Sequence, residues 1–317
     1  MLSRTANNLF WMARYVERGE NTARILDVTY RMSLMPQDPS VAQKEWFAPL
    51  NITGILFPFT GRYSTVGSHD VLRYMVLDLD NPSSILSCAK AARENARAVR
   101  GAITSEMWEV LNSTWLELQQ FNESRLDSGG VSQFFDWVKE RAHLFRGVTV
   151  GTALKDEAFH FNRLGIFLER ADNTARILDV KYHVLLPSVE DVGGAVDYYQ
   201  WAAVLRSVSA FESYRKVYRD VITPLRVAEL LILRDDMPRS LHACMRETYD
   251  IMQLLRRPQT TEALRLAGAL WSELHFGRID VIFNQGLHEY LTDFLTQTDA
   301  LGDEINRSYF TLGREGR

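Results

Sequence analysis

The sequence is poor in residues that interrupt regular structure. Its 317 residues include only 18 glycines and 9 prolines, too few for the frequent turns of a sandwich or barrel. Two cysteines, Cys88 and Cys244, are too few for a disulfide framework or a cysteine metal cluster, so we expect both to be small core residues. No glycine-rich phosphate loop, G-x-S-x-G or H-E-x-x-H motif occurs. No familiar catalytic machinery is therefore visible.

The chain also lacks any excess of basic residues. Its formal net charge is −4 and its pI is near 6.0, whereas a nucleic-acid-binding surface needs basic side chains to neutralise phosphates. No apolar run approaches the roughly 20 residues that span a bilayer. Residues 1–8 lack the basic and apolar segments of a signal peptide. We therefore expect a cytoplasmic protein without a nucleic-acid or membrane partner.

Apolar residues make up 46% of the chain, and they recur at helical spacing. Asp80 and Asp236, each followed two residues later by proline, are the predicted N-caps of two helices. Most of the irregular chain is expected at 35–66 and 187–194. No stretch shows strand alternation, so we predict an all-α protein. Helices are predicted over 83–101, 105–122, 131–147, 155–186, 223–233, 239–256, 260–285 and 287–311.

One segment of fourteen residues occurs twice in the chain. Residues 17–30 and 169–182, which we call the signature helices, are identical at eleven of fourteen positions. Glu20 in the first is replaced by the similar Asp172 in the second, at a shift of 152 residues. Helix propensity accepts many residues at each position, so it cannot explain this agreement. The agreement indicates an internal duplication.

A second match extends the repeat beyond one helix. Residues 80–88 align with residues 236–244 at a shift of 156 residues, four more than the signature helices show. The two halves are therefore predicted as 1–150 and 151–317, with a boundary near 147–153. We predict that they pack as one compact domain, an internally duplicated helical bundle with pseudo-twofold symmetry.

The signature helices carry charged residues on otherwise apolar helices. At 100° per residue, Asn21 and Arg24 share the face of Glu17, and apolar residues occupy the other sides. Such a helix is expected to be buried, so its charged side chains must find partners. The second copy repeats the arrangement, and the candidate site residues on the two helices are Glu17, Glu20, Asn21, Arg24, Glu169, Asp172, Asn173 and Arg176.

Two interpretations of these charges stay open. In the first, the glutamates and arginines form ion pairs that clamp neighbouring helices together. Glu17 and Arg24 lie two turns apart, so each would bridge more naturally to another helix than to its own partner. In the second, the two charged faces line a shared polar pocket. There Glu17 or Glu169 could act as a catalytic base, and the arginines could bind a carboxylate or phosphate.

Two charged clusters are not repeated. Arg93, Glu94, Asn95 and Arg97 lie in the first half, where the equivalent residues of the second half have lost the pattern, and Glu212 and Arg215 lie only in the second half. A single asymmetric site would produce such divergence between the halves, and ordinary sequence divergence at surface positions would produce it as well. Glu157 and His160 have the spacing of a di-iron ligand pair, but the first half has no counterpart. We therefore expect no metal and no cofactor.

The first signature helix and its flanks resemble a known family. Residues 3–24, SRTANNLFWMARYVERGENTAR, closely resemble the opening of the bacterial alpha-E domain family. Residues 93–97, RENAR, and 167–176, FLERADNTAR, are similar to it as well, and the resemblance covers essentially the whole chain. Asn7 is a departure, because an acidic residue is expected there. Arg14, within the first stretch, joins the candidate binding residues.

The resemblance implies a helical protein that works beside circularly permuted ATP-grasp ligases, enzymes that join a carboxylate to an amine. It thus implies an accessory or binding component of a peptide- or amide-forming system, with a separate ligase as partner and an amino-acid or peptide-like ligand. Two alternatives stay open: an enzyme in its own right acting on such a substrate, and a purely structural bundle. A homo-oligomer is compatible with all three.

Overall fold

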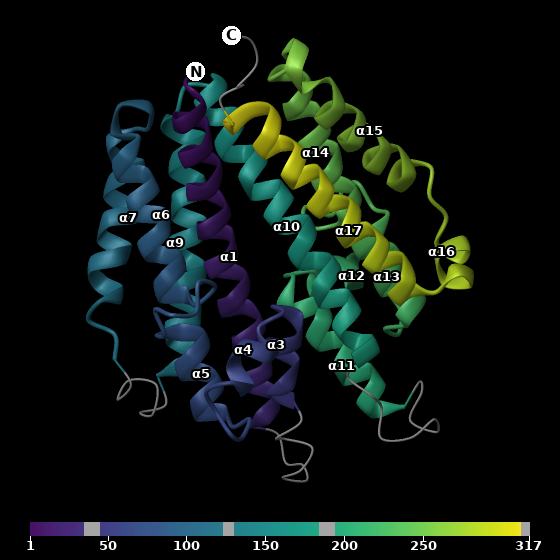
Figure 1. The fold of residues 1–317 in the computed structure, drawn as a ribbon. Helices are drawn as coiled ribbons and strands as arrows, with labels where there is room; N and C mark the ends of the chain where they lie inside the picture. The colour runs from purple at the N-terminus through teal and green to yellow at the C-terminus, as the bar shows by residue number, and fades with distance from the viewer. Residues whose placement is uncertain (35–44, 123–129, 184–193, 312–317) are drawn as a thin grey trace.

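Every regular element that the structure describes is a helix, which confirms the all-α prediction (Figure 1). The computed structural model describes residues 1–34, 45–122, 130–183 and 194–311. The helices of the first half are α1 (Ser3–Ser33), α3 (Phe47–Ile52), α4 (Leu56–Thr60), α5 (Ser68–Val76), α6 (Ile85–Ala98), η1 (Arg100–Ala102), α7 (Ser105–Leu118) and α9 (Val131–Thr152).

The second half continues without a strand in the described ranges. Its helices are α10 (Glu157–His183), α11 (Ala195–Ser207), α12 (Phe211–Tyr218), α13 (Pro224–Ile232), α14 (Leu241–Leu254), η3 (Pro258–Thr260), α15 (Thr261–His275), α16 (Ile279–Gln285), α17 (Leu287–Ile305) and the π-helical turn η4 (Asn306–Phe310). Among the helices of these described ranges, none combines the length and apolarity needed to cross a membrane.

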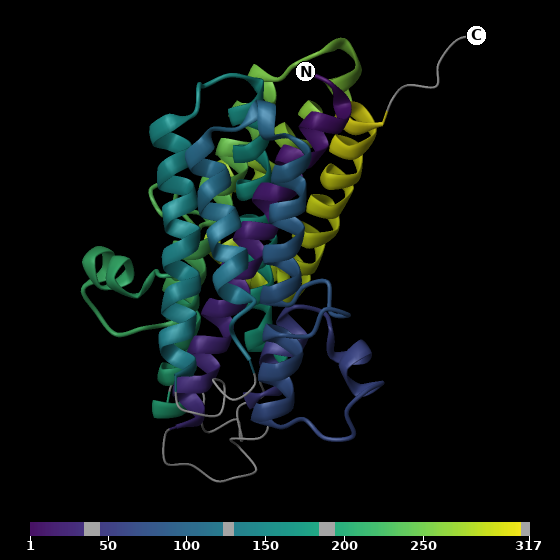
Figure 2. The same ribbon diagram turned by 90° about the vertical axis from the view of Figure 1, so that its left-hand side faces the viewer.

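The two signature helices, contained in α1 and α10, lie side by side at the centre of the molecule (Figure 1). α1 also packs against α6 and α9, and α10 packs against α14 and α17. Figure 2 shows α17 and η4 ending beside the first turns of α1. Because both central helices carry apolar residues on all sides, packing them between other helices removes the most apolar surface from water.

The two central helices approach each other closely at Gly165 of α10. A Cβ atom at this position would lie 2.3 Å from the carbonyl oxygen of Phe10 and 3.3 Å from the Cβ of Ala13. Glycine is required here because the backbone of α1 occupies the space of any side chain. This contact brings the charged faces of α1 and α10 within reach of each other.

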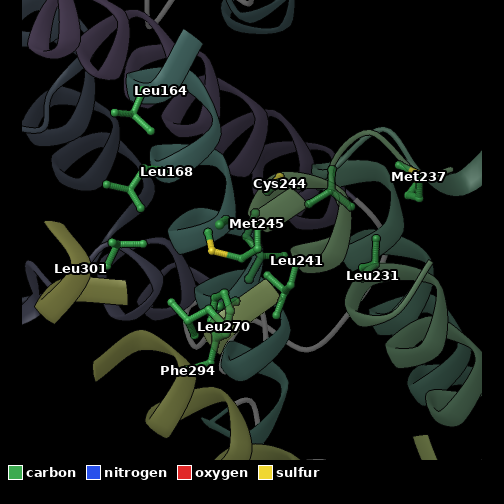
Figure 3. Close-up of a cluster of buried hydrophobic side chains, with 14 of the residues drawn as sticks. Leu164, Leu168, Leu231, Met237, Leu241, Cys244, Met245, Leu270, Phe294 and Leu301 are labelled. Carbon is green, nitrogen blue, oxygen red and sulfur yellow. The ribbon is translucent and has the colours of Figure 1, made fainter. Parts of the chain in front are cut away.

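The core joins both halves of the chain. One large cluster of buried side chains includes Phe10 of α1 together with Leu168 of α10 and Leu301 of α17. Figure 3 shows part of it, where Leu168 and Leu301 gather with Met245 of α14 and Phe294 of α17. A smaller cluster of buried side chains joins α5 to the C-terminal half of α1 and the N-terminal half of α9.

The helix starts predicted at Asp80 and Asp236 are wrong. The N-caps are Ser84 and Ser240, whose hydroxyls accept the backbone N–H of the third residue along, at 3.0 Å in both cases. The chain makes one more turn after each proline before the helix begins, and the two aspartates instead pair with exposed arginines at Arg62 and Arg234. Both caps keep the 156-residue shift, although the duplication itself stays an interpretation of the sequence.

Two further predicted bounds differ from the structure. The single helix predicted over 260–285 is divided into α15 and α16 by residues 276–278. Glycine suits this break because a Cβ on Gly277 would lie 2.8 Å from the carbonyl oxygen of Glu273. The helix predicted to end at residue 147 runs to Thr152, so the link between the halves lies at 153–156. The predicted irregular stretch at 35–66 contains α3 and α4, while its residues 35–44 lie outside the described residues, as do 187–193.

Candidate functional site

The Glu-Arg pairs of the two signature helices bind each other reciprocally. Arg170 donates from Nε to Oε1 of Glu17 at 2.9 Å and from Nη2 to Oε2 at 3.1 Å. In the same way Arg18 donates from Nε to Oε1 of Glu169 at 2.5 Å and from Nη2 to Oε2 at 3.0 Å. Each glutamate thus accepts a bidentate pair of hydrogen bonds from the arginine of the other helix. The pairs fasten α1 to α10 at their crossing.

Around Glu17 lies a larger buried group, which we call the arginine cluster: Glu17, Glu20, Arg24, Arg146, Arg170 and Arg239. Glu17 also accepts from Arg239 at 2.8 Å and from Arg146 at 2.9 Å. Glu20 accepts from Arg24 at 2.7 Å, from Arg239 at 2.9 Å and from Arg146. Both carboxylates are fully buried. Four guanidinium groups thus surround two carboxylates, and every carboxylate oxygen is bonded.

The surrounding arginines keep these carboxylates charged. Burial by itself would raise the pKa of Glu17, but the charges of Arg170, Arg239 and Arg146 outweigh it and hold the pKa far below its usual range. By the same balance of burial against arginine charges, the pKa falls to about 2 for Glu20 and for Glu169. A carboxylate with such a pKa is a weak base near neutral pH. The geometry of Glu17 and Glu169 therefore favours the clamp over the catalytic base.

Stability should consequently fall in acid. Glu20 and Glu169 have an ordinary pKa of 4.5 and a folded pKa of about 2. Their contribution is therefore complete above pH 4.5 and is lost as the pH falls toward 2. The free energy of unfolding should drop by about 1.4 kcal/mol per pH unit for each such carboxylate. Urea unfolding at pH 7, 5, 4 and 3 measures this slope, and a free energy that stays constant between pH 5 and 3 would contradict it.

Four arginines at the centre were not among the sequence candidates. Arg18 and Arg170 occupy equivalent positions in the two signature helices, so the repeat itself contained a signal for them. Arg146 and Arg239 have no such signal, because at the 156-residue shift their equivalents are Gly302 and Ser83. Only the folded chain brings these two arginines to Glu17 and Glu20.

The other candidates on the signature helices are buried or bonded to a neighbour. Asn21 accepts from Arg239 at 3.1 Å, and its buried amide nitrogen has no partner among the described residues. Asn173 is buried on α10. Arg176 donates to both oxygens of Asp172, at 2.9 and 3.0 Å, whereas Arg24 donates twice to Oε1 of Glu20.

The unrepeated clusters lie elsewhere. Arg93 donates to Asn112 of α7 at 2.9 Å and to Glu94 at 2.6 Å, while Arg97 donates to Glu94 at 3.3 Å. Asn95 bonds the backbone of its own helix. These contacts keep the cluster on the partly exposed surface of α6 and α7. Glu212 and Arg215 are exposed on α12 and, in the described part of the chain, form no ion pair with the central residues.

A cavity of about 400 Å³ opens between α1, α10 and α17. We call it the α17 cavity. Arg14 lies in its wall, with Nε donating to Oε2 of Glu169 at 2.7 Å and its guanidinium 4.8 Å from the centre of the Trp11 ring. The lining residues are Phe10, Trp11, Arg14, Leu168, Asp172, Thr298, Asp299, Gly302, Asp303, Asn306 and Phe310. Arg14 and Asp172 are therefore the sequence candidates that face open space.

Other places offer less. A hollow of about 490 Å³ between α7 and α9 contains none of the sequence candidates. Within the described ranges, no three His, Cys, Asp or Glu side chains gather as a metal site. Glu157 bonds the N-terminal amine and Arg257, each at 2.6 Å. Burial raises the pKa of Cys88 and of Cys244 to about 12, so neither thiol is activated.

Residues 1–310 match the family described as "Alpha-E", "a predicted alpha-helical domain with a conserved ER motif". The chain belongs to the Alpha-E family. The Glu-Arg dipeptides at 17–18 and 169–170 have the composition of that motif, and they form the reciprocal pairs between α1 and α10. Uncharacterized proteins from Mycobacterium bovis and Mycobacterium tuberculosis are 33% identical over 121 residues, which is 34% of this chain and only 14% of theirs. No solved structure matches the chain.

Proposed function

We propose that this Alpha-E protein is a binding and scaffolding component of a peptide- or amide-forming system, and that it acts with a separate ATP-grasp-type ligase. The observation that carries the proposal is the α17 cavity. It offers an arginine, three aspartates and aromatic rings to a ligand, while the buried glutamates nearby are engaged in ion pairs. Such a site suits holding an amino-acid or peptide-like ligand.

The relatives add support of a different kind. The matched region is 14% of the length of the mycobacterial proteins, so a similar helical region occurs there within a much longer chain. An arrangement of that sort fits a module that works beside other domains. In this protein, the ligase would be a second polypeptide that docks on the helical surface.

Co-expression with an ATP-grasp-type ligase of the same organism tests the proposal. We expect a complex that survives gel filtration, and a ligase whose ATP turnover with amino-acid acceptors changes several-fold when the helical protein is present. The ligase alone and the ligase with an unrelated helical bundle are the controls. If no complex forms and the ATP turnover of the ligase does not change, the proposal is ruled out.

A second candidate is an enzyme in its own right, and one observation favours it. Burial and the charge of Asp172 raise the pKa of Asp299 above its ordinary value, the direction that an acid–base catalyst near neutral pH requires. Turnover of an amino-acid derivative by the isolated chain would support this candidate if Asp299→Asn abolished turnover without changing the melting temperature.

A further inference from the structure

The α17 cavity occupies the place that an arginine fills in the other half of the molecule. α9 and α17 begin at Val131 and Leu287, 156 residues apart. At that shift, Arg146 of α9 corresponds to Gly302 of α17. Arg146 places its guanidinium between Glu17 and Glu20. Gly302 has no side chain, and the equivalent volume is open.

The carboxylate beside this opening has fewer partners than its counterpart. Glu20 binds three guanidinium groups, those of Arg24, Arg146 and Arg239. The equivalent Asp172 pairs with Arg176, and among the described residues it forms no second ion pair within 4.0 Å. The charge of Arg18 acts on it only from a greater distance. Asp172 thus lacks the cations that Arg146 and Arg239 supply in the first half.

Two further aspartates make the cavity more acidic than the arginine cluster. Asp299 stands at the position equivalent to His143, and Asp303 lies one turn further along α17. Neither has an ion-pair partner among the residues that the structure describes. Burial and Asp172 raise the pKa of Asp299. Burial and the like charge of Asp172 disfavour the charged Asp299 carboxylate more than the charges of Arg176 and Arg14 favour it, so a cation placed here would gain binding energy.

Arg14 does not supply that cation. It takes the part of Arg146 at Glu169, since it donates to Oε2 of that glutamate at 2.7 Å. It forms no ion pair within 4.0 Å with any of the three cavity aspartates in the described structure. Its guanidinium, held against the Trp11 ring, would instead suit a ligand carboxylate.

The remaining wall of the cavity also points to a ligand. Thr298 is 3% exposed and lines the cavity, and its hydroxyl has no hydrogen-bond partner among the described residues. A donor or acceptor left in this state is costly unless something bonds to it. Trp11 and Phe310 add aromatic rings to the wall, and the face of such a ring attracts organic cations.

We propose that the α17 cavity binds the side-chain ammonium or guanidinium group of a small amino-acid-like ligand, beside Asp172, Asp299 and Thr298, in the place that Arg146 fills in the first half. The proposal rests on the proposed function, because it names the chemistry of the ligand that the scaffold would hold. It also explains the asymmetry of the two halves: one site carries its own cation, and the other admits one from outside.

Isothermal titration calorimetry of the full chain with agmatine, L-arginine and L-citrulline tests this assignment. Agmatine and L-arginine should bind with millimolar or lower Kd, and citrulline, which has the shape of arginine without its side-chain charge, about tenfold more weakly. Asp172→Asn and Asp299→Asn should each weaken agmatine about tenfold or more. The exposed Glu106→Gln serves as the matched control and should leave binding unchanged.

Gly302 provides the sharpest variants. A Cβ at this position meets only Leu168, at 3.8 Å, so Gly302→Ala should fold as the natural chain does. Gly302→Arg supplies an internal guanidinium and should abolish agmatine binding. Equal binding of citrulline and arginine, no binding of either cation, or full agmatine binding by Gly302→Arg would overturn the inference.

These results separate the two proposals. The ligase complex is measured without any added cation, so cation binding can fail while the complex forms, which would sink the inference alone. If the cation binds but no ligase complex forms, the scaffolding function is contradicted and the ligand assignment is retained. If Gly302→Arg does not fold, Asp299→Asn and the comparison of arginine with citrulline still decide the question.

Discussion

Replacing Glu17 by glutamine should lower the free energy of unfolding by about 3–5 kcal/mol. Glutamine has nearly the same size, so the change removes charge and leaves the volume filled. Arg146, Arg170 and Arg239 would then face one carboxylate, Glu20, instead of two, deep inside the protein. Removing one partner of a buried ion pair is costly because the other charge stays buried without compensation. Urea unfolding at neutral pH measures the loss.

An exposed carboxylate on another helix provides the matched control. Glu106→Gln changes an exposed carboxylate on α7 and should shift the free energy of unfolding by less than about 0.5 kcal/mol. An unchanged stability of Glu17→Gln, combined with loss of ligand binding or of the effect on the ligase, would show that Glu17 serves a site. The structure leads us to expect the opposite, because both oxygens of the carboxylate accept hydrogen bonds from arginines.

The charged pattern of the signature helix revealed that buried charges exist, but not where their partners lie. The spacing of Glu17 and Arg24 predicts bridges to other helices. The structure places Arg170 of α10 against Glu17, whereas Arg24 forms its ion pair with Glu20 of its own helix. Arg146 and Arg239, by contrast, come from 129 and 222 residues away in the sequence. Contacts over such separations depend on how helices cross, and periodicity within one helix contains no information about that crossing.

The α17 cavity was beyond sequence reasoning for a related reason. Its defining feature is a missing side chain, Gly302, at a position where the other half has Arg146. A glycine within a helical pattern attracts attention only when its equivalent is known to fill a space. The sequence candidates Arg93 and Arg215 lie away from this cavity, Arg93 half-buried on α6 and Arg215 exposed on α12. Asymmetry between the halves mattered, but at positions of α9 and α17 that face the central helices.

Replacing Gly165 by alanine should destabilise the protein by about 3 kcal/mol or more. The added methyl group would lie 2.3 Å from the carbonyl oxygen of Phe10, and a backbone atom cannot move aside without displacing α1. Displacement of α1 would also lengthen the hydrogen bonds between Arg170 and Glu17, because Arg170 lies little more than one turn after Gly165 on α10. Steric overlap and weakened ion pairs therefore act in the same direction.

A matched glycine in another helix isolates this effect from helix propensity. Gly147 lies inside α9, is exposed, and has no other atom within 4 Å of the place that an added methyl group would take, so Gly147→Ala should stabilise the protein by about 0.5–1 kcal/mol. Thermal and urea unfolding of the two variants give the comparison. If Gly165→Ala were as stable as Gly147→Ala, α1 and α10 could separate at no cost. The reciprocal Glu-Arg pairs could then not be what sets the distance between the halves.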